Sequence, residues 1–490
     1  MVGRSGQGPV LPFILPHRPT VFRLSSTSKP AIAGITIAAL MIASAQNPLT
    51  STLIAVALPS IGHDMLVDLV LATSLLVTSY FVISIVAQGP GGRFSDLFGH
   101  ARTLWVGLAL YAGGALVGFF APHVSLLVVS RCVMAGAGAL VIPATVALLR
   151  LHVPPERRGR VFGLFSATMS FSAAVGPALS GELVSQFGWR AIYLANLPFL
   201  TVVALLLWFY PVPPAPARTS ESAGIAAGFR ALDFAGLALM TVSLLLLVVA
   251  SREAGALRGL LLVAALGMAV AFVRRQFRVA EPVLEVRLFR IPAFAAGTGI
   301  IGLQNFAMYA LLFELPQFFE RFRGTPPREV GYTLFTMMAG MVMMAPVGGR
   351  LMDRYGARRV GLLGSGVLLA GSLLLCRITS FASPVDAVLP LLLFGMGMGL
   401  CSAPAQSSAM SAVPPQQAGM AAGISSTLRY LGGILGVVLL GMVLGSNETV
   451  TEGRHALMMG LFAVSVVLSV FMCLRLPQAP TGPDKQGSPG

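Results

Sequence analysis

Apolar residues occur in this chain in runs long enough to cross a lipid bilayer. The 490 residues are 56% hydrophobic and only 10% charged, whereas a soluble chain carries roughly 25% charged residues to cover its core. The apolar runs are about 20 residues long, the length that spans about 30 Å of hydrocarbon as a helix. The sequence therefore predicts an all-α membrane protein.

The apolar runs predict fourteen membrane-spanning helices. They are expected near residues 33–58, 69–91, 104–121, 126–149, 161–186, 191–211, 232–251, 257–273, 293–319, 330–348, 359–380, 387–411, 418–442 and 454–474.

Lys and Arg are distributed unevenly over the predicted loops. Of the 33 basic residues, 23 lie in the two tails and in loops on the same side, and 7 lie in loops on the other side. This bias predicts that both termini are cytoplasmic. The net charge of +15 thus marks topology, and no nucleic-acid partner is expected.

Several function classes are disfavoured. No Walker A motif for ATP is present, and the loops are too short for a soluble catalytic domain, so the chain is not expected to be an enzyme. The four cysteines fall within apolar runs, which argues against a disulfide framework, a metal site or any bound cofactor.

One loop sequence occurs twice, after the second and the tenth predicted spans. Both copies fit G-x-L/F-x-D-x-x-G followed by basic residues, where glycine permits a tight reversal and Asp is expected to pair with a helix N-terminus or an arginine. The loop residues are Gly92, Asp96, Gly99 and Arg102 in the first copy, and Gly349, Asp353, Arg354, Gly356 and Arg358 in the second.

The spacing of the two copies predicts an internal repeat. They lie 257 residues apart, whereas six spans with short loops occupy about 180–200 residues. The surplus accommodates two further helices, which gives a six-plus-two-plus-six arrangement. The expected parts are a disordered basic tail (1–30), a six-helix half (31–212), a linker with two inserted helices (213–290), a second six-helix half (291–475) and a tail (476–490).

The repeated loop resembles motif A of the major facilitator superfamily, and the inserted pair resembles its fourteen-span drug:proton antiporter branch, the EmrB/QacA type. Gly176, Pro177 and Gly181 are similar to the antiporter motif of the fifth span, which implies a hinge between the halves. The chain departs from that family at five positions, which are Thr50 in place of the first-span carboxylate, Ala55, Leu97, Met134 and Ser180.

Three charged residues within the spans are candidates for proton coupling. By resemblance Arg131 is the coupling arginine of such transporters, although it also suits snorkelling to the interface. Glu182 and Glu314 suit reversible protonation, or are carboxylates at headgroup level. Because Thr50 does not titrate, Glu182 and Glu314 remain as acidic residues within the spans. The resemblance implies that the ninth span lines the cavity, so Glu314 is the preferred proton carrier and Arg131, on another helix that lines the cavity by the same resemblance, is its expected partner.

Polar residues of the ninth span are candidates for a substrate cavity. Asn305 and Tyr309 share a helix face, but Glu314 lies about 180° around the helix from Asn305, so one straight helix does not direct both sets into one cavity. The expected cavity residues are Gln304, Asn305, Tyr309 and, in the thirteenth span, Arg429.

The resemblance implies a multidrug-efflux type of membrane transport. We expect a monomeric, multi-pass protein of a bacterial cytoplasmic membrane that exports small amphipathic molecules by alternating access in exchange for protons. The alternatives are a proton-independent facilitator or specific metabolite exporter, favoured by Thr50, and a non-transporting sensor or lipid enzyme.

The charge bias predicts the side on which each loop lies. A reporter fused at residue 225 is expected to report a cytoplasmic location and one at residue 325 an external location. An external signal at residue 225 contradicts the six-plus-two-plus-six arrangement.

Overall fold

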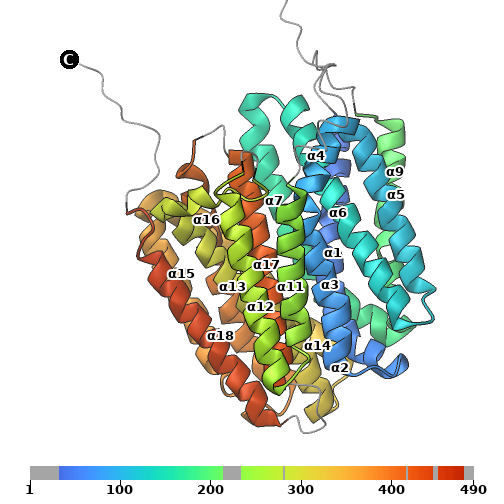
Figure 1. Ribbon diagram of the computed structural model, residues 1–490, viewed down its shortest axis with the longest axis vertical. Coiled ribbons are helices and arrows are strands. Elements are labelled where there is room, and N and C mark those ends of the chain that lie inside the picture. The colour runs from blue at the N-terminus through green and yellow to red at the C-terminus, as the bar shows by residue number, and fades with distance from the viewer. Residues whose placement is uncertain (1–32, 213–232, 280–281, 415–417, 445–450, 479–490) are drawn as a thin grey trace, which may run out of the picture.

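The computed structural model describes residues 33–212, 233–279, 282–414, 418–444 and 451–478, and these are almost entirely helical (Figure 1). The tail 1–30, most of the tail 476–490 and the loop around residue 225 lie outside the described residues. The α-helices are α1 (Gly34–Asp64), α2 (Leu69–Thr73), α3 (Ser79–Val86), α4 (Gln88–Phe98), α5 (His100–Phe119), α6 (Val124–His152), α7 (Pro155–Phe187), α8 (Ala191–Leu194), α9 (Asn196–Phe209), α11 (Phe234–Ala250), α12 (Gly255–Gln276), α13 (Pro292–Arg323), α14 (Pro327–Tyr355), α15 (Ala357–Leu375), α16 (Val388–Ser411), α17 (Ala418–Leu444) and α18 (Glu452–Cys473).

Eleven helices of the described chain are long and apolar enough to cross a membrane, or twelve if the bent pair Leu71–Val86 and Gln88–Phe98 is one span. The expected fourteen spans are not confirmed by this criterion of length and hydropathy. Two predicted spans do not meet the criterion, each for a physical reason. α11 has only 17 residues, and the apolar stretch of the 33-residue α7 is interrupted by serines, glycines and Pro177.

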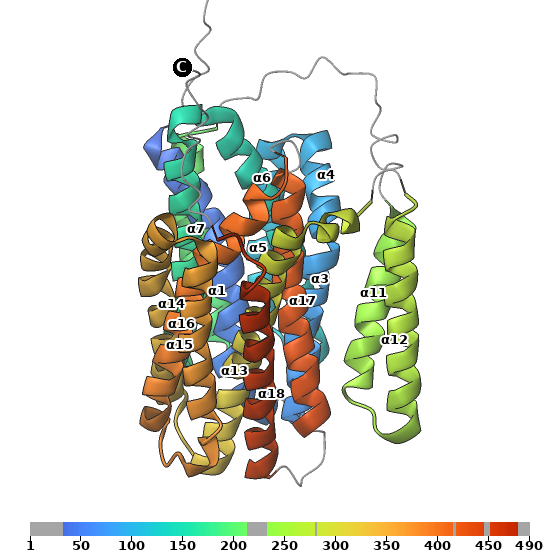
Figure 2. The ribbon, with the colours of Figure 1, turned by 90° about the vertical axis from the view of Figure 1, so that its left-hand side faces the viewer.

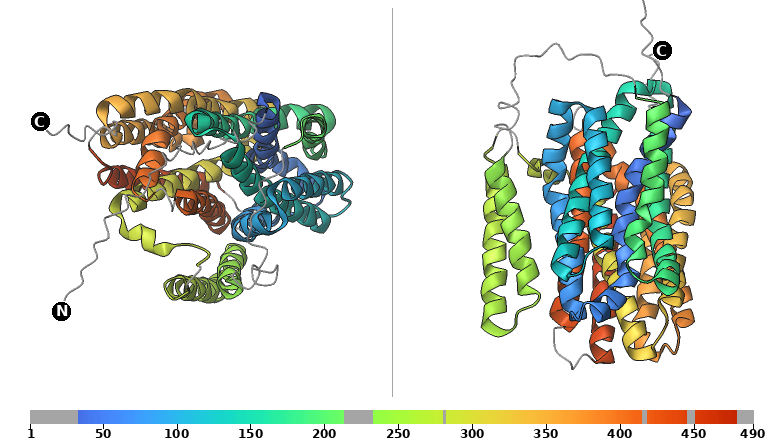
Figure 3. Two further views of the ribbon diagram at one scale, coloured as in Figure 1. Left: turned by 90° about the horizontal axis from the view of Figure 1, so that it is seen from above. Right: turned by 90° about the vertical axis from the view of Figure 1, so that its right-hand side faces the viewer.

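The helices form two bundles with a separate hairpin beside them. α1–α9 form the N-terminal bundle and α13–α18 form the C-terminal bundle, and the two lie side by side when seen from above (Figure 3). The α11–α12 hairpin stands outside both (Figure 2), where α11 contacts α3 and α17. The bundles meet mainly through α7 and α14, α1 and α13, and α3 and α17.

The two ends of the molecule are distinguished by their loops. The repeated motif loops lie at one end, called the motif-loop end, where the backbone N–H of Arg358 donates to the carbonyl of Pro477, close to the last described residue. α1 also begins at this end (Figure 1). At the opposite end, called the Arg323 end, α1 and α13 finish and α18 begins.

The two motif loops have the same backbone reversal. Gly99 between α4 and α5 has φ 91° and ψ 136°, and Gly356 between α14 and α15 has φ 85° and ψ 157°. These values lie in a region that only glycine adopts without strain, which explains why both copies carry glycine there. Asp96 and Asp353 are exposed, and neither makes the expected ion pair with a described arginine.

The hairpin is tied together at the motif-loop end by Asp233, which precedes α11. Its carboxylate accepts hydrogen bonds from the N–H of Gly236 at 2.8 Å, Arg275 at 2.7 Å and Gln276 at 3.0 Å. Burial by itself would raise the pKa of Asp233, but these donors together hold it below its ordinary value. The carboxylate therefore stays charged at neutral pH and clamps α11 to α12.

The conformation of Gly99 makes it sensitive to any side chain. Nothing lies within 4 Å of a Cβ added there, so Gly99→Ala introduces backbone strain alone, of about 1–3 kcal/mol. We expect a melting temperature a few degrees below that of the native protein. Gly113→Ala in the following helix is the control, since its Cβ is equally unobstructed and alanine favours helix. Equal melting temperatures for the two variants contradict the strained backbone conformation assigned to residue 99.

Candidate functional site

Arg131 of α6 lies in the interior, with 1% of its surface exposed. Its Nε donates to the carbonyl of Leu76 at 3.1 Å and its Nη1 donates to the carbonyl of Thr50 at 3.0 Å. The guanidinium lies 4.1 Å from the centre of the Tyr80 ring. Snorkelling to an interface is therefore wrong for this residue, because its charge is held by carbonyl dipoles and an aromatic face.

A local irregularity of the second span provides one of these carbonyls. Residues Ser74–Thr78 form a π-helical turn between α2 and α3. Such turns are wider than an α-helical turn and are frequent at functional sites. Here the turn contains Leu76, whose carbonyl accepts from Arg131, so the irregular backbone contributes directly to holding the buried charge.

Thr50 occupies the centre of a buried network. Its hydroxyl donates to Oδ1 of Asn196 at 2.9 Å and accepts from the hydroxyl of Tyr111 at 2.6 Å, while its carbonyl accepts from Arg131. The network joins α1, α5, α6 and α9 of the N-terminal bundle. Thr50 therefore has a structural role that its side chain performs without any charge.

Asn47, one turn before Thr50, connects the two bundles. Its Nδ2 donates to the hydroxyl of Tyr430 on α17 at 2.8 Å, and its Oδ1 accepts from the hydroxyl of Tyr80 at 2.6 Å. The ring of Phe81 lies beside these groups, with its centre 4.9 Å from that of Tyr309 and 5.9 Å from that of Tyr430. Tyrosine and phenylalanine rings thus line the junction of the two bundles.

α13 presents two different faces, which resolves the question left open by the helix periodicity. Tyr309 faces the N-terminal bundle through Phe81. Glu314 faces α18 instead, where its Oε1 lies 2.6 Å from Nδ1 of His455. Glu314 is 0% exposed and His455 is 1% exposed. The expected pairing of Glu314 with Arg131 is therefore wrong for this conformation, because the two side chains point to different helices.

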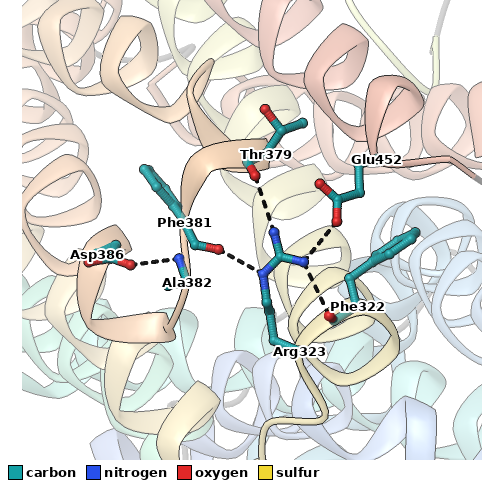
Figure 4. Close-up of polar contacts among 7 residues, drawn as sticks. All are labelled: Phe322, Arg323, Thr379, Phe381, Ala382, Asp386 and Glu452. Carbon is teal, nitrogen blue, oxygen red and sulfur yellow. Dashed lines mark hydrogen bonds and ion pairs between the residues drawn. The ribbon is translucent and has the colours of Figure 1, made fainter.

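Arg323, the last residue of α13, is the centre of a polar cluster at the Arg323 end (Figure 4). Its guanidinium donates to Glu452 at 2.8 Å, to the carbonyl of Phe381 at 2.7 Å and to the carbonyl of Thr379 at 3.2 Å. These bonds join the end of α13, the start of α18 and the α15–α16 connection. Three parts of the C-terminal bundle are therefore held together at this point.

Glu182 of α7 contacts the other bundle at the same end. Its Oε2 lies 2.9 Å from Nε of Arg328 on α14 and accepts from the hydroxyl of Tyr332 at 3.3 Å. Close backbone contact accompanies this pair, since a Cβ added at Gly331 would lie 2.5 Å from the carbonyl of Pro177 and 3.1 Å from Cα of Gly181. Pro177 and Gly181 therefore pack against the C-terminal bundle, whereas Gly176 packs against Thr52 of α1 in its own bundle.

The remaining predicted cavity residues lie in different surroundings. Gln304 is buried beside Cys401 of α16, and Asn305 donates to the carbonyl of Ile301 in its own helix at 2.8 Å. Arg429 of α17 is exposed, and Gly433, four residues further on the same helix face, packs against the ring of Tyr309. Only Tyr309 and Arg429 of the predicted set are thus brought together at the junction.

A separate apolar groove of about 630 Å³ lies between α13, α17 and α18. Leu428, Leu431 and Leu435 of α17 line it, and Arg475 stands at its rim. Leucines of α17 thus face this groove, whereas Arg429 and Tyr430 of the same helix face the junction of the bundles.

Sequence reasoning did not identify Asn47, Tyr80, Tyr430 or His455 as site residues. Asn47 lies among small and apolar residues, and the tyrosines suit an interfacial position as well as a buried one. His455 follows Glu452 and Arg454 closely and therefore has the sequence surroundings of a loop residue. The i, i+3 spacing of Asn47 and Thr50 was the one available signal, since it places two polar side chains on one face of an apolar helix.

Comparison with known proteins identifies a family. The family model described as the Major Facilitator Superfamily matches residues 40–437. Among solved structures, the D-xylose-proton symporter superposes with a TM-score of 0.65 at 14% identity, covering 91% of this chain and 98% of that one. At that identity the likeness concerns the fold alone.

Curated bacterial relatives are similar over most of their length. YwoD of Bacillus subtilis, an uncharacterised MFS-type transporter, is 30% identical over 85% of this chain and 91% of its own. The multidrug resistance protein Stp of Mycobacterium tuberculosis is 31% identical, with 83% and 75% covered. The tetracenomycin C resistance and export protein of Streptomyces glaucescens is 28% identical, with 85% and 76% covered.

The Asn47 network predicts a stability difference between two buried asparagines. Asn47→Leu leaves the hydroxyl of Tyr430 without its hydrogen-bond partner, whereas the hydroxyl of Tyr80 keeps the backbone carbonyl of residue 47 at 3.1 Å. A buried unsatisfied group costs about 1–3 kcal/mol. We expect a clear fall in the melting temperature. Asn305→Leu is the matched control, because that amide bonds only a carbonyl of its own helix. A fall as large for Asn305→Leu as for Asn47→Leu contradicts the network's role in joining the bundles.

Proposed function

This chain belongs to the Major Facilitator Superfamily of secondary transporters, and from that premise we propose that it exports small amphipathic molecules across the cytoplasmic membrane in exchange for protons. Two relatives are named for drug resistance or export, which supports the exporter among the transporter functions. The observation that carries the proposal is the pattern of contacts between the bundles.

Side-chain bonds between the two bundles lie at mid-span and toward the Arg323 end. The Asn47–Tyr430 bond is midway along α1 and α17. The Glu182–Arg328 ion pair, the Tyr332–Glu182 bond and a bond of 3.4 Å from Gln317 to the hydroxyl of Thr73 lie nearer the Arg323 end. Two bundles in contact at one end suit a transporter closed on that side, with alternation by rocking about the junction. Following the charge bias, we assign the Arg323 end to the outside and the motif loops and both termini to the cytoplasm.

We propose fourteen spans for this protein, of which α7 and α11 are the two additional ones. α7 has 33 residues, and at a rise of 1.5 Å per residue it is about 50 Å long, ample for a bilayer. α11 is antiparallel to α12, which is itself long and apolar enough to span, and a bond of 2.9 Å from Ser243 to the carbonyl of Ala265 joins them midway.

Glu314 and His455 are proposed to carry the exchanged proton. The free oxygen of Glu314 and Nε2 of His455 are buried without a partner in the described chain, so the pair is isolated from water. A dry site favours a pair of zero net charge, which holds one proton between the carboxylate and the imidazole. The charged groups nearest the pair are Glu452 with Arg323, and Arg454, which bonds the carbonyl of Leu444.

Uptake of that proton from the outside requires water to reach the pair. The Arg323 cluster lies between the pair and the Arg323 end, so breaking its bonds during opening exposes His455 to the outside. In the closed arrangement the pair is cut off from the outside, so a proton taken up there is released only toward the cytoplasm. Glu182 is less suited to this role, because its partner Arg328 stabilises the charged carboxylate.

A second candidate is a facilitator that works without protons. Thr50 favours it, because this buried position has an uncharged side chain that is fully engaged with Asn196 and Tyr111. Export that a protonophore leaves unchanged supports the facilitator.

The proton role of Glu314 predicts a specific defect. Glu314→Gln cannot take up a proton, so we expect substrate accumulation by inverted vesicles under a pH gradient to fall at least tenfold. Substrate binding is expected to remain within a few-fold, since Glu314 faces away from the junction of the bundles.

Glu320→Gln is the matched control for this experiment. Glu320 lies on the same helix but is exposed, and accumulation is expected to stay near the native level. If Glu314→Gln accumulates substrate at the native rate, Glu314 is not the proton carrier.

A further inference from the structure

Arg429 lies at the junction of the two bundles and Arg131 lies behind the Tyr80 ring that borders it, and no described carboxylate pairs with either arginine. From this we infer that the transported substrate is an anionic aromatic molecule, held by Arg131 and Arg429 among the tyrosine rings. The inference rests on the proposed export function and specifies the substrate class of the same site.

Arg131 supplies a buried charge that is only partly compensated. Its Nε and Nη1 donate to two backbone carbonyls, and its Nη2 is buried with no hydrogen-bond partner in the described chain. A cation deep in a span is expensive unless it faces water or a partner. The Tyr80 ring contacts Arg131 and its hydroxyl bonds Asn47 at the junction, so an anion at the junction compensates this charge across that ring.

Arg429 supplies a second cation on the other bundle. It lies near the middle of α17, about 16 Å along the helix from Ala418 at 1.5 Å per residue. Gly433, four residues further on the same helix face, packs against the junction, since a Cβ added there would lie 2.9 Å from the Tyr309 ring and 3.3 Å from the Phe81 ring. The apolar groove on α17 is lined by Leu428, Leu431 and Leu435 instead. Arg429 is exposed on the side that faces the junction, and no described carboxylate forms an ion pair with it.

The acidic residues of the described chain are placed elsewhere. Glu314 bonds His455 on α18, and Glu182 bonds Arg328 at the Arg323 end. The others lie in loops or in the first or last turns of their helices. A cationic substrate at the junction would therefore meet two arginines and no described counter-charge, whereas an anion meets a complementary surface.

The aromatic residues specify the rest of the substrate. Phe81 lies with its ring centre 4.9 Å from Tyr309 and 6.5 Å from Phe313, and Tyr80 and Tyr430 complete the cluster from the two bundles. Aromatic side chains stack on flat rings and bring hydroxyls for hydrogen bonding. A planar ring system with one carboxylate or phenolate therefore matches both the rings and the arginines.

The charge of the substrate also determines how transport responds to voltage. An anion that leaves while a proton enters moves two positive charges inward in electrical terms. A monovalent cation exchanged for one proton moves none. An inside-negative potential is therefore expected to drive export of the anion and to leave one-for-one cation exchange unchanged.

Two dyes with the same ring system and opposite charge test the inference. Fluorescein is an anionic xanthene and rhodamine 6G is a cationic one. We expect the purified full chain to bind fluorescein at least tenfold more tightly, measured by fluorescence anisotropy. Proteoliposomes are expected to transport fluorescein faster when a potassium–valinomycin potential is applied. Tighter binding of rhodamine 6G overturns the inference.

Variants of Arg429 separate this inference from the export function. Arg429→Gln is expected to weaken fluorescein binding about tenfold, and Arg429→Glu to shift the preference toward rhodamine 6G. Arg475→Gln at the rim of the apolar groove is the control and is expected to bind as the native chain does. Unchanged fluorescein binding in both Arg429 variants overturns the inference.

If rhodamine 6G is exported and fluorescein is not, export stands and the anionic substrate is wrong. If fluorescein binds but neither dye is transported, the substrate class stands and export fails.

Discussion

A charge that is buried among membrane-spanning helices must find its compensation inside the protein, and Arg131 shows how much of this structure depends on that constraint. Its guanidinium draws on the carbonyls of Leu76 and Thr50 and on the ring of Tyr80. The carbonyl of Leu76 belongs to a π-helical turn, and Thr50 is itself held by Tyr111 and Asn196. One cation thereby positions five helices of the N-terminal bundle and directs Tyr80 toward the junction with the other bundle.

The contact between the bundles combines polar bonds with close backbone approach, and these two kinds of contact have different roles. Hydrogen bonds such as Asn47–Tyr430 are directional and break cleanly when the helices separate. Glycine at positions 181 and 331 lets α7 and α14 approach until their backbones touch, as small residues do in membrane helix pairs.

The sequence predicts the helices and the motif loops well, because both follow from local constraints. Apolar runs report span length, and Gly99 and Gly356 mark a backbone conformation that only glycine adopts. The partner of Glu314 was not predictable in the same way, since His455 lies 141 residues away and the rotation of α13 depends on its packing against several helices. Arg131 also illustrates this limit. Its burial depends on the Leu76 carbonyl, and no residue pattern announces the π-helical turn that contains it.

α13 links the two processes that a coupled transporter must connect. Tyr309 and Glu314 are five residues apart, which places them about 140° apart around one rigid helix, so one contacts the N-terminal bundle and the other contacts α18. A change in charge at the α13–α18 contact alters the force on the whole helix and therefore on the Tyr309–Phe81 contact. Suppose that protonation of Glu314 and His455 changes the affinity for a ligand that displaces Tyr309. By reciprocity, binding of that ligand changes the proton affinity of the pair by the same factor. If Glu314 carries the exchanged proton as proposed, coupling in this arrangement needs no direct contact between substrate and proton.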